Sequence, residues 1–397
     1  GRKVLNVPNL RFPEFQEEWS VTTLQKDCIV NPTNEKIADK FVYVDLESVK
    51  QGQLYKYQIL TKGNAPSRAQ RVLHTDDILF QCVRPYQMNN YMVKETMSDI
   101  QWVASTGYAQ IRTQTDYPAF LYYVLNTSKY NKAVMVRCTG SSYPAINSED
   151  LSKIPFYKCG ITEQKKIADF LSLLDERIAT QNKIIDKLQS LIKGLNDSLY
   201  AQYGDKVLTS FAELGTSYSG LSGKSAQDFG SGKPFITYLN VYSNNIINEN
   251  DFQYVAIKNG EKQNIVEYGD VLFTLSSETP EEVGIGSVYL GKEKVYLNSF
   301  CFGIHITNME VAFPPYLSYY VSSTAFRKFI YPYAQGSTRF NLCKADFEKA
   351  SIKLPTIENQ KRIYSILGHI DCKIETERQM LNLYNSQKQY LLRQMFI

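Results

Sequence analysis

Hydrophobic residues recur every three or four positions in two long segments of the chain, which is the pattern of a heptad stripe. The first stripe consists of Leu171, Leu174, Ile178, Ile185, Leu188, Ile192, Leu195 and Leu199, with Gln181 as its polar member. The second consists of Leu367, Ile370, Ile374, Leu381, Tyr384, Leu391 and Met395, with Glu377 and Lys388 as its polar members. Each stripe predicts a helix of roughly 40 residues, about 60 Å long. Because neither helix can bury its stripe alone, we expect the two to pair, although each could instead pack on its own domain.

The two helical segments are parts of an internal repeat. Shifting the sequence by 196 residues places 107–201 over 303–397 without a gap, and about a fifth of these 95 positions are identical. The strongest match sets 163–167 over 359–363. Upstream of these two aligned segments, the halves of the chain match only in short stretches, such as 77–80 with 270–273. Each half therefore consists of a variable front and a more constant back.

The relation between the halves predicts how the helices run. If a pseudo-two-fold axis relates the halves, the two helices must be antiparallel. Gln181 lies at the midpoint of the first helix, and Glu377 is its repeat mate. We therefore expect these two side chains to meet near the axis, within about 12 Å, where buried polar residues can set the register.

The variable fronts alternate apolar and polar residues over short runs. Strands are predicted at 41–44, 77–80, 235–238 and 271–273, and helices are predicted to begin at Pro118 and Pro314. The predicted fold class is α+β, with two mixed α/β domains joined by two long antiparallel coiled-coil helices. The predicted boundaries are 1–155 for the first domain, 156–204 for the first helix, 205–350 for the second domain and 351–397 for the second helix.

Composition narrows the class of protein. The chain has 397 residues, of which 43% are hydrophobic and 21% charged, as expected of two or three globular domains. It contains no apolar run long enough to span a membrane, and no secretory signal is expected. The seven cysteines are scattered without a C-x-x-C motif, which favours buried thiols in the reducing cytoplasm over disulfides or zinc. The net charge of +4 is uneven, because 205–350 holds 12 basic and 15 acidic residues.

Loops that follow the predicted strands carry residues suited to nucleic-acid recognition. Arginine, glutamine and asparagine read guanine and adenine edges, serine and threonine contact bases or phosphates, and glycine-serine turns can hold phosphate through backbone N–H groups. In the first domain the candidates are Arg68, Arg71, Arg84, Gln87, Asn89, Asn90, Ser141, Ser142 and Tyr143. In the second they are Ser276, Ser277, Thr279, Ser337, Thr338 and Arg339. Ordinary polar surface loops and structural turns remain alternatives for these segments.

Signatures of catalysis are weak. The run 313–316 is similar to the Asn/Asp-Pro-Pro-Tyr/Phe loop of adenine methyltransferases, but Phe313 cannot accept a hydrogen bond from the target amino group. The run 223–225 resembles the end of a phosphate-binding loop, but Tyr218 occupies the position of its first glycine. His74, His305 and His369 are the only histidines and lack ligand-type neighbours. We therefore expect no metal site and no catalytic activity in this chain.

The duplicated motifs resemble those of the specificity subunit of type I restriction–modification systems. The resemblance spans the whole chain and rests on Gly140-Ser141-Ser142, then 163–167 and a long heptad helix, in a pattern that occurs twice. The opening segment 6–15 looks like that of a staphylococcal-type member. The chain departs from the family at Cys159, where a proline is usual and the second copy has Pro355, and Asn359 stands where the first copy has Glu163.

The resemblance implies that each variable front is a target recognition domain that reads one half of a bipartite, asymmetric DNA sequence. The paired helices would set the spacing and dock two methyltransferase subunits, which motor–nuclease subunits join. The subunit itself would bind no cofactor and catalyse nothing, while its partners would use S-adenosylmethionine, magnesium and ATP. Two other classes remain open: a two-domain scaffold with no DNA role, and an enzyme with an unrecognised site.

Overall fold

The computed structural model describes residues 6–33, 35–94, 100–203 and 207–397. The chain divides into two compact units. Unit 1 comprises Gly1–Asn182 with Gln379–Ile397, and unit 2 comprises Lys183–Arg378. Each unit thus combines one variable front with one part of each long helix, as the repeat predicts. No helix among the described residues is long and apolar enough to cross a membrane.

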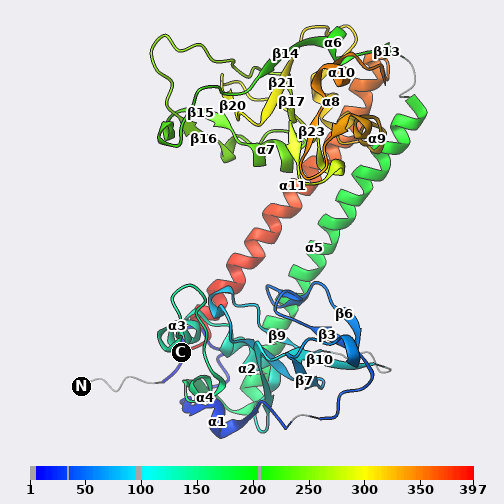
Figure 1. The fold of residues 1–397 in the computed structure, drawn as a ribbon. Coiled ribbons are helices and arrows are strands. Elements are labelled where there is room, and N and C mark those ends of the chain that lie inside the picture. Colours follow the sequence, from blue (N-terminus) through cyan, green and yellow to red (C-terminus); the bar gives the residue numbers. More distant parts are fainter. Residues whose placement is uncertain (1–5, 34, 95–99, 204–206) are drawn as a thin grey trace. The chain divides into compact units, whose positions relative to one another are not determined.

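Unit 1 contains two four-stranded sheets, and Figure 1 labels their strands β3, β6, β7, β9 and β10. One sheet has the order β2-β11-β8-β9, with β2 (Cys28–Val30), β8 (Ile78–Gln81), β9 (Tyr91–Met92) and β11 (Tyr108–Thr113). The other has the order β6-β3-β10-β7, with β3 (Lys40–Val44), β6 (Gln58–Thr61), β7 (Ala69–Leu73) and β10 (Gln101–Ser105). Two antiparallel pairs complete the strands: β1 (Ser20–Thr23) pairs with the distant β12 (Pro155–Lys158), and β4 (Val49–Lys50) forms a hairpin with β5 (Gln53–Leu54). The strands predicted at 41–44 and 77–80 are confirmed within one or two residues.

Helices cover the first of these sheets. They are α1 (Leu24–Asp27), α2 (Pro118–Leu125), α3 (Ser128–Arg137) and α4 (Ser148–Ser152), with short 3-10 turns η1 (Lys62–Asn64) and η2 (Pro85–Gln87). The helix predicted to begin at Pro118 is confirmed, and all its later residues are buried. Phe120 is fully buried and packs edge-on against Trp19, with ring centroids 5.8 Å apart. This aromatic cluster forms the core between sheet and helices.

Unit 2 repeats the mixed architecture with different strands. Its main sheet has the order β14-β21-β17-β19, with β14 (Gly215–Ser219), β17 (Val271–Thr274), β19 (Gly286–Val288) and β21 (Cys301–Ile306). The other strands are β13 (Val207–Thr209), β15 (Phe229–Ile236), β16 (Gln253–Val255), β18 (Ser276–Ser277), β20 (Tyr296–Leu297), β22 (Ala334–Gln335), β23 (Phe340–Leu342) and β24 (Ile352–Leu354). The short helices are α6 (Phe211–Leu214), α7 (Tyr238–Ser243), α8 (Pro314–Tyr320), α9 (Thr324–Ile330) and α10 (Lys344–Lys349), with 3-10 turns η3 (Ala226–Asp228), η4 (Glu249–Asp251), η5 (Pro280–Glu282) and η6 (Tyr331–Tyr333).

The expected strands of unit 2 form with one difference. The strand predicted at 271–273 and the helix predicted to begin at Pro314 are confirmed. The strand predicted at 235–238 ends at Ile236, because the Thr237 side chain accepts a hydrogen bond from the Asn240 N–H and caps α7.

The two long helices are α5 (Ile161–Tyr203) and α11 (Ile357–Gln394). In unit 1 the first part of α5 shares a hydrophobic core with the last part of α11, and Lys388 of α11 forms an ion pair with Asp175 of α5 at 2.6 Å. In unit 2 the last part of α5 packs against the core that contains Ile363 and Leu367 of α11. Opposite ends of the helices therefore meet in each unit, which confirms the antiparallel order.

The predicted pairing residues lie on the inner faces of both helices. Leu171, Leu174, Ile178, Gln181, Ile185, Leu367 and Ile374 are buried, and Leu188, Ile370, Glu377, Leu381 and Tyr384 are partly buried. Gln181 and Glu377 belong to different units, so their expected meeting stays a prediction. The segments predicted as helical, 156–204 and 351–397, each begin with a strand before the helix starts at Ile161 or Ile357. These strands are β12, which pairs with β1, and β24, which pairs with β13.

A buried glutamine makes the same contacts in both units. The Gln164 Oε1 accepts from the Tyr117 N–H at 2.8 Å, and its Nε2 donates to the Cys159 carbonyl at 2.9 Å. Its repeat mate Gln360 accepts from the N–H of residue 313 and donates to the carbonyl of residue 355, both at 2.8 Å. A tyrosine–aspartate pair is repeated as well, Tyr123 with Asp175 and Tyr319 with Asp371. These side chains attach the start of each long helix to its domain, and the proline-to-cysteine change at Cys159 leaves the contact intact.

Candidate functional site

The loop after β8 in unit 1 has an unusual backbone. Arg84 and Met88 both adopt left-handed conformations, with φ of 54° and 53°, at the two ends of the turn η2. Left-handed backbone in residues other than glycine is uncommon and persists where the surroundings enforce it, often at functional sites. Pro85 begins the turn and restricts it further. The backbone of the loop that carries four of the predicted recognition residues is therefore conformationally restricted.

This loop lies against the loop that follows Gly140. The Arg84 N–H donates to the Pro144 carbonyl at 2.7 Å, and Val83 forms an isolated β-bridge with Ala145. The Arg84 guanidinium stacks over the Tyr143 ring, 4.4 Å from its centroid. A guanidinium that lies over a ring keeps its N–H groups in its own plane, where they can donate to a partner. The structure thus joins two segments that the sequence suggested separately.

Both loops line an open concavity of about 540 Å³. Its polar and aromatic lining residues are Glu47, Lys50, Tyr55, Lys56, Gln81, Arg84, Gln87, Asn89 and Tyr143. Tyr55 and Tyr143 are largely exposed, and Lys50 lies over the Tyr55 ring at 4.7 Å. Glu47 is the one acidic lining residue and pairs with Lys56 at 2.9 Å. The lining is basic and aromatic, which suits a nucleic-acid backbone and its bases.

Two side chains stabilise the concavity from beneath. Asn90 is buried, accepts from the Gln81 N–H at 2.8 Å and donates to the Asn126 side chain at 3.2 Å. In this structure the Asn90 amide therefore supports the loop rather than facing the concavity, and a contact between Asn90 and DNA stays a prediction. Gln81 is also buried and contacts both Gln87 and Asn89. The sequence analysis missed this role of Gln81. A glutamine at the end of an apolar strand carries no sequence signal that its side chain is buried.

The other two arginines of unit 1 lie outside this concavity. Arg68 is exposed just before β7, and its carbonyl accepts from the Thr106 N–H. Arg71 lies within β7 and is partly buried, and burial lowers the pKa of its guanidinium. The Arg71 Nε makes no hydrogen bond to any described residue. Arg68 therefore remains available on the surface, whereas Arg71 is largely withdrawn from it.

The serines predicted to read DNA in unit 2 lie inside a sheet. Ser276 and Ser277 form β18, are buried, and pair with Asn341 and Phe340 of β23. The Ser277 Oγ donates to Glu282 at 3.0 Å. Their burial corrects the expectation that this segment is an exposed loop, and the reason is that the polar run 274–279 satisfies its backbone by pairing. Thr279 is exposed and precedes η5.

The glycine-serine turns occur at equivalent places in both units. Gly140 and Gly336 have positive φ values of 89° and 144°, and a Cβ atom would approach the carbonyl oxygen three residues later to 2.9 Å and 2.1 Å. Glycine is therefore required by the turn itself. The residues that follow, Ser141, Ser142 and Tyr143 in one unit and Ser337, Thr338 and Arg339 in the other, are exposed. The second turn connects β22 to β23, so it adjoins β18.

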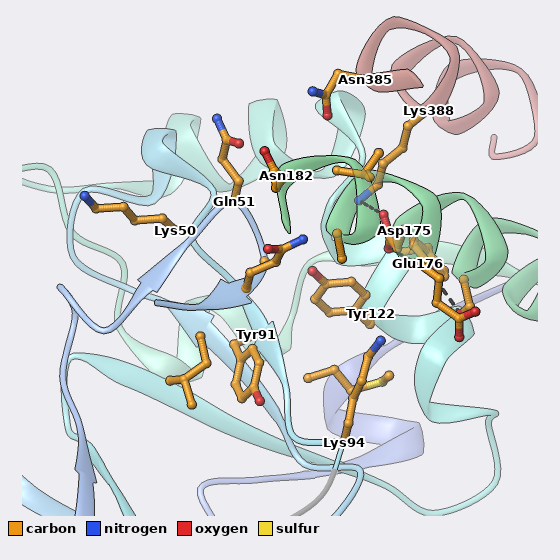
Figure 2. Close-up of a pocket in the computed structure, with 18 residues that line it drawn as sticks. Lys50, Gln51, Tyr91, Lys94, Tyr122, Asp175, Glu176, Asn182, Asn385 and Lys388 are labelled. Atoms are coloured by element: carbon orange, nitrogen blue, oxygen red, sulfur yellow. Dashed lines mark hydrogen bonds and ion pairs between the residues drawn. The ribbon is translucent and has the colours of Figure 1, made fainter. Parts of the chain in front are cut away.

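A second cavity of unit 1 lies between the recognition domain and the helices (Figure 2). It measures about 270 Å³ and is lined by β5, β9, α2, α5 and α11. In Figure 2, Lys388 points toward Asp175, while Tyr91 and Lys94 lie on another side of the cavity. Lys50 lines both cavities, so the β4–β5 hairpin lies between them.

Polar side chains of the kinds used in catalysis have structural partners. Lys224 donates to the Ala256 carbonyl at 2.6 Å and to Glu261 at 2.7 Å, so its ammonium anchors two loop segments. His305 contacts the buried Asp270 at 2.9 Å, and Tyr218 donates to the same carboxylate at 2.6 Å. Among the described residues, no group of three or more His, Cys, Asp or Glu side chains could hold a metal ion.

The cysteines are present as thiols. All seven are free, and Cys28, Cys82 and Cys301 are buried. Burial raises the pKa of the Cys28 and Cys82 thiols to about 12. Such thiols remain protonated and unreactive at neutral pH.

The long helices also expose apolar side chains. In unit 1, Phe170 of α5 is 41% exposed and Met380 of α11 is 40% exposed. In unit 2 the repeat mates, Ile366 of α11 and Ile184 of α5, are 39% and 37% exposed. Two pairs of repeat-related positions, 170 with 366 and 184 with 380, are therefore apolar and exposed in both units, and Phe170 also packs edge-on against Phe12, with ring centroids 5.9 Å apart.

Comparison with known proteins identifies the family. A model described as the type I restriction modification DNA specificity domain matches twice, at residues 27–190 and 213–383, which is well over half the chain. The chain is 24% identical over 430 aligned positions to the putative type I restriction enzyme MjaX specificity subunit of Methanocaldococcus jannaschii, covering 94% of this chain and 91% of that protein. It is 22% identical to the HindI specificity subunit of Haemophilus influenzae over 43% of this chain and 35% of that protein.

Solved structures share the fold. A chain from a type I R-M system, solved for its complex assembly and conformational transition, superimposes with a TM-score of 0.58 at 20% identity, covering 94% of this chain and 96% of the other. The S subunit of the type I restriction–modification system of M. genitalium gives a TM-score of 0.54 at 15% identity, covering 98% and 99%. The staphylococcal subtype suggested by the opening residues stays a prediction. The two family matches, each falling on one recognition domain with its helix, mean that this chain belongs to the type I restriction–modification DNA specificity family.

Proposed function

We propose that this chain selects the DNA sequence for a type I restriction–modification complex. The recognition domain of each unit reads one half of a bipartite, asymmetric target. The observation that carries the proposal is that the two units share the same scaffold but have different candidate recognition surfaces. The contacts of Gln164 with the backbone of its unit are repeated by Gln360 in the other unit. The segments that follow the matched strands differ: in unit 1 this segment lines the basic concavity around Arg84, whereas in unit 2 its residues Ser276 and Ser277 are buried.

The duplicated scaffold explains why the proposed DNA target has two separate half-sites. Two readers with equivalent scaffolds but different loops recognise different sequences, so the target cannot be a palindrome. The helices α5 and α11 connect the readers and set the distance between the half-sites. Half-sites on one face of DNA are centred about one helical turn, roughly 34 Å, apart.

The helices also dock the catalytic partners. The exposed apolar residues Phe170 and Met380 in unit 1 recur as Ile366 and Ile184 in unit 2. Two equivalent surfaces suit two copies of one partner, and we assign them to two methyltransferase subunits, which motor–nuclease subunits join in the full complex. In this assignment the chain catalyses nothing and binds no cofactor. Its partners use S-adenosylmethionine, magnesium and ATP, and the complex acts on DNA in the cytoplasm.

The charge distribution supports a division of labour. Residues 205–350 carry more acidic than basic side chains, so the second reader lacks a broad basic footprint. The partner subunits therefore supply much of the nonspecific attraction to DNA, and this chain supplies the choice of sequence.

Methylation mapping tests the proposal. The chain is co-expressed with methyltransferase subunits, and the DNA of the host is sequenced for methylated bases. The expected result is one split motif that disappears when this chain is omitted. A scaffold with no DNA role predicts the same methylation pattern with and without the chain, and an independent enzyme predicts methylation by the chain alone.

A further inference from the structure

The hydrogen-bond network beneath the Arg84 loop determines which polar atoms the loop presents outward. The Gln81 side chain is 1% exposed and accepts a hydrogen bond from the Asn89 N–H at 3.1 Å through its Oε1. A backbone N–H can only donate, so this contact fixes the orientation of the Gln81 amide. The Gln81 Nε2 must then donate to its other neighbour, the Oε1 of Gln87, at 2.8 Å.

The same logic extends to the amides of Gln87, which is exposed, and Asn89, which is partly buried. Because the Gln87 oxygen accepts from Gln81, the Gln87 NH₂ group is the end left for a ligand. The Asn89 Oδ1 accepts from the Gln51 N–H at 3.1 Å, so Asn89 also keeps only its NH₂ group. The Arg84 guanidinium carries donors alone and stacks on Tyr143. No described residue accepts a hydrogen bond from these three groups.

The Arg84 guanidinium and the amides of Gln87 and Asn89 therefore present donors to a ligand. Reading adenine through glutamine or asparagine needs a donor and an acceptor of the same amide to point outward, whereas here each amide oxygen is turned toward a protein N–H that it accepts from. Guanine presents two acceptors, O6 and N7, in the major groove, whereas cytosine presents its amino donor there. An arginine fork matches the two guanine acceptors bidentately.

We propose that the first recognition domain reads guanine, with Arg84 contacting its O6 and N7 edge and Gln87 donating to an adjacent acceptor. Gln81 is the positioning residue that aims the Gln87 NH₂ group outward. This inference rests on the proposed DNA specificity function and adds to it the class of base that one half-site contains. Phosphate oxygens are also acceptors, so the experiment must separate a base contact from a phosphate contact.

Gln87→Glu is the most direct test. The substitution keeps the shape of the side chain, and one carboxylate oxygen still accepts from Gln81 Nε2. The other oxygen replaces the outward donor with an acceptor at an exposed position. Arg84→Lys keeps the charge but removes the bidentate fork. Arg137→Lys is the matched control, because Arg137 lies on α3, is exposed and does not line the concavity.

The assay measures methylation of a randomised DNA library by the complex of this chain with methyltransferase subunits. We expect a guanine in the first half-site, on either strand, in the wild-type motif. Arg84→Lys should relax the preference for that guanine by about tenfold or more. Gln87→Glu should shift one neighbouring position toward a base with an outward donor, cytosine or adenine, and Arg137→Lys should leave the motif unchanged.

Two results would overturn the inference. One is a first half-site without guanine at any position that responds to Arg84. The other is an unchanged motif with uniformly weaker methylation in both loop variants, which identifies a phosphate contact. In both cases a wild-type motif that depends on this chain still supports the proposed function, whereas a wild-type complex without any motif refutes the function itself.

Discussion

Replacement of Gln164 by alanine tests how the long helix is held to the first recognition domain. The Gln164 side chain accepts from the Tyr117 N–H and donates to the Cys159 carbonyl and to Asp116 Oδ1 at 2.8 Å. It is only 2% exposed, so the variant removes a partner from the buried Asp116 and from the backbone of the partly buried Tyr117 and Cys159. Asp116 keeps Lys158 at 3.0 Å, which limits the loss at the carboxylate.

The expected destabilisation follows from these contacts. A buried hydrogen bond contributes about 1 kcal/mol net, and a buried group left unpaired costs about 1–3 kcal/mol. Three lost bonds, one of them partly compensated, therefore lower the free energy of unfolding of unit 1 by about 3 kcal/mol. For a domain of about 200 residues this corresponds to a fall in Tm of roughly 6–12 °C.

The repeat supplies a matched control. Gln360→Ala removes the equivalent contacts to residues 313 and 355 from unit 2, together with a hydrogen bond to the Val311 carbonyl that takes the place of the one to Asp116. Gln164→Glu and Gln360→Glu therefore place the new carboxylate in different surroundings. The second oxygen of a glutamate at 164 would face the Asp116 carboxylate, whereas at 360 it would face the carbonyls of Val311 and Pro355. Gln164→Glu should therefore destabilise its unit more than Gln360→Glu does.

Hydrogen exchange measured by mass spectrometry resolves the two units without assuming two-state unfolding. Gln164→Ala should lower amide protection in α2 and at the start of α5, with little change in α8. Gln360→Ala should do the reverse. Equal losses in both units, or a change in unfolding free energy below about 1 kcal/mol, would refute the view that these glutamines attach each helix to its own domain.

Three further predictions concern recognition, spacing and pH. Arg84→Ala should weaken or relax the first half-site alone, at about 1–3 kcal/mol in competition binding by the assembled complex, and uniform weakening across unrelated sequences would contradict a base contact. Insertion of one heptad into α5 or α11 should change the gap between the half-sites but not their sequences, and methylation maps with altered half-sites and the original gap would contradict this. Lys224, with the Lys258 N–H and Gln263, lowers the pKa of Glu261 from 4.5 to about 2. This contact therefore stabilises unit 2 fully above about pH 4.5, and its contribution is lost as the pH falls toward 2. The Tm of Glu261→Gln, measured between pH 2 and 6, should therefore depend less on pH than the Tm of the wild type. The same pH dependence of Tm in both proteins would contradict the assignment.

The heptad stripes and the repeat could be predicted from the sequence because they rest on regular spacing. Apolar residues every three or four positions can bury only one helix face, and that face is the one found inside for Leu171, Ile178 and Leu367. The strands and the proline helix starts were found for the same reason. Boundaries were less certain, because β12 and β24 depend on partners far away in the chain, β1 and β13.

The structure places the predicted recognition residues in different surroundings, and their contacts with DNA stay a prediction. Arg84, Gln87, Asn89 and Tyr143 gather around one concavity, although nothing in their spacing states that two loops some 55 residues apart would meet. Asn90, Ser276 and Ser277 carry the same kinds of polar atoms but are buried. A polar residue in a turn-like run has no sequence signal that separates an outward side chain from one that satisfies the backbone beneath it.

The sequence by itself determined that this protein consists of two copies of a recognition domain followed by a long helix, because the heptad periodicity and the internal repeat can be read directly from the order of residues. Only the tertiary structure decided which atoms the first reader presents. The amide of Gln87 has a donor and an acceptor, and its neighbour Gln81, held in turn by the Asn89 N–H, uses the acceptor. Hydrogen bonds are directional and each buried donor or acceptor needs a partner, so the choice of base depends on contacts that exist only after the chain has folded.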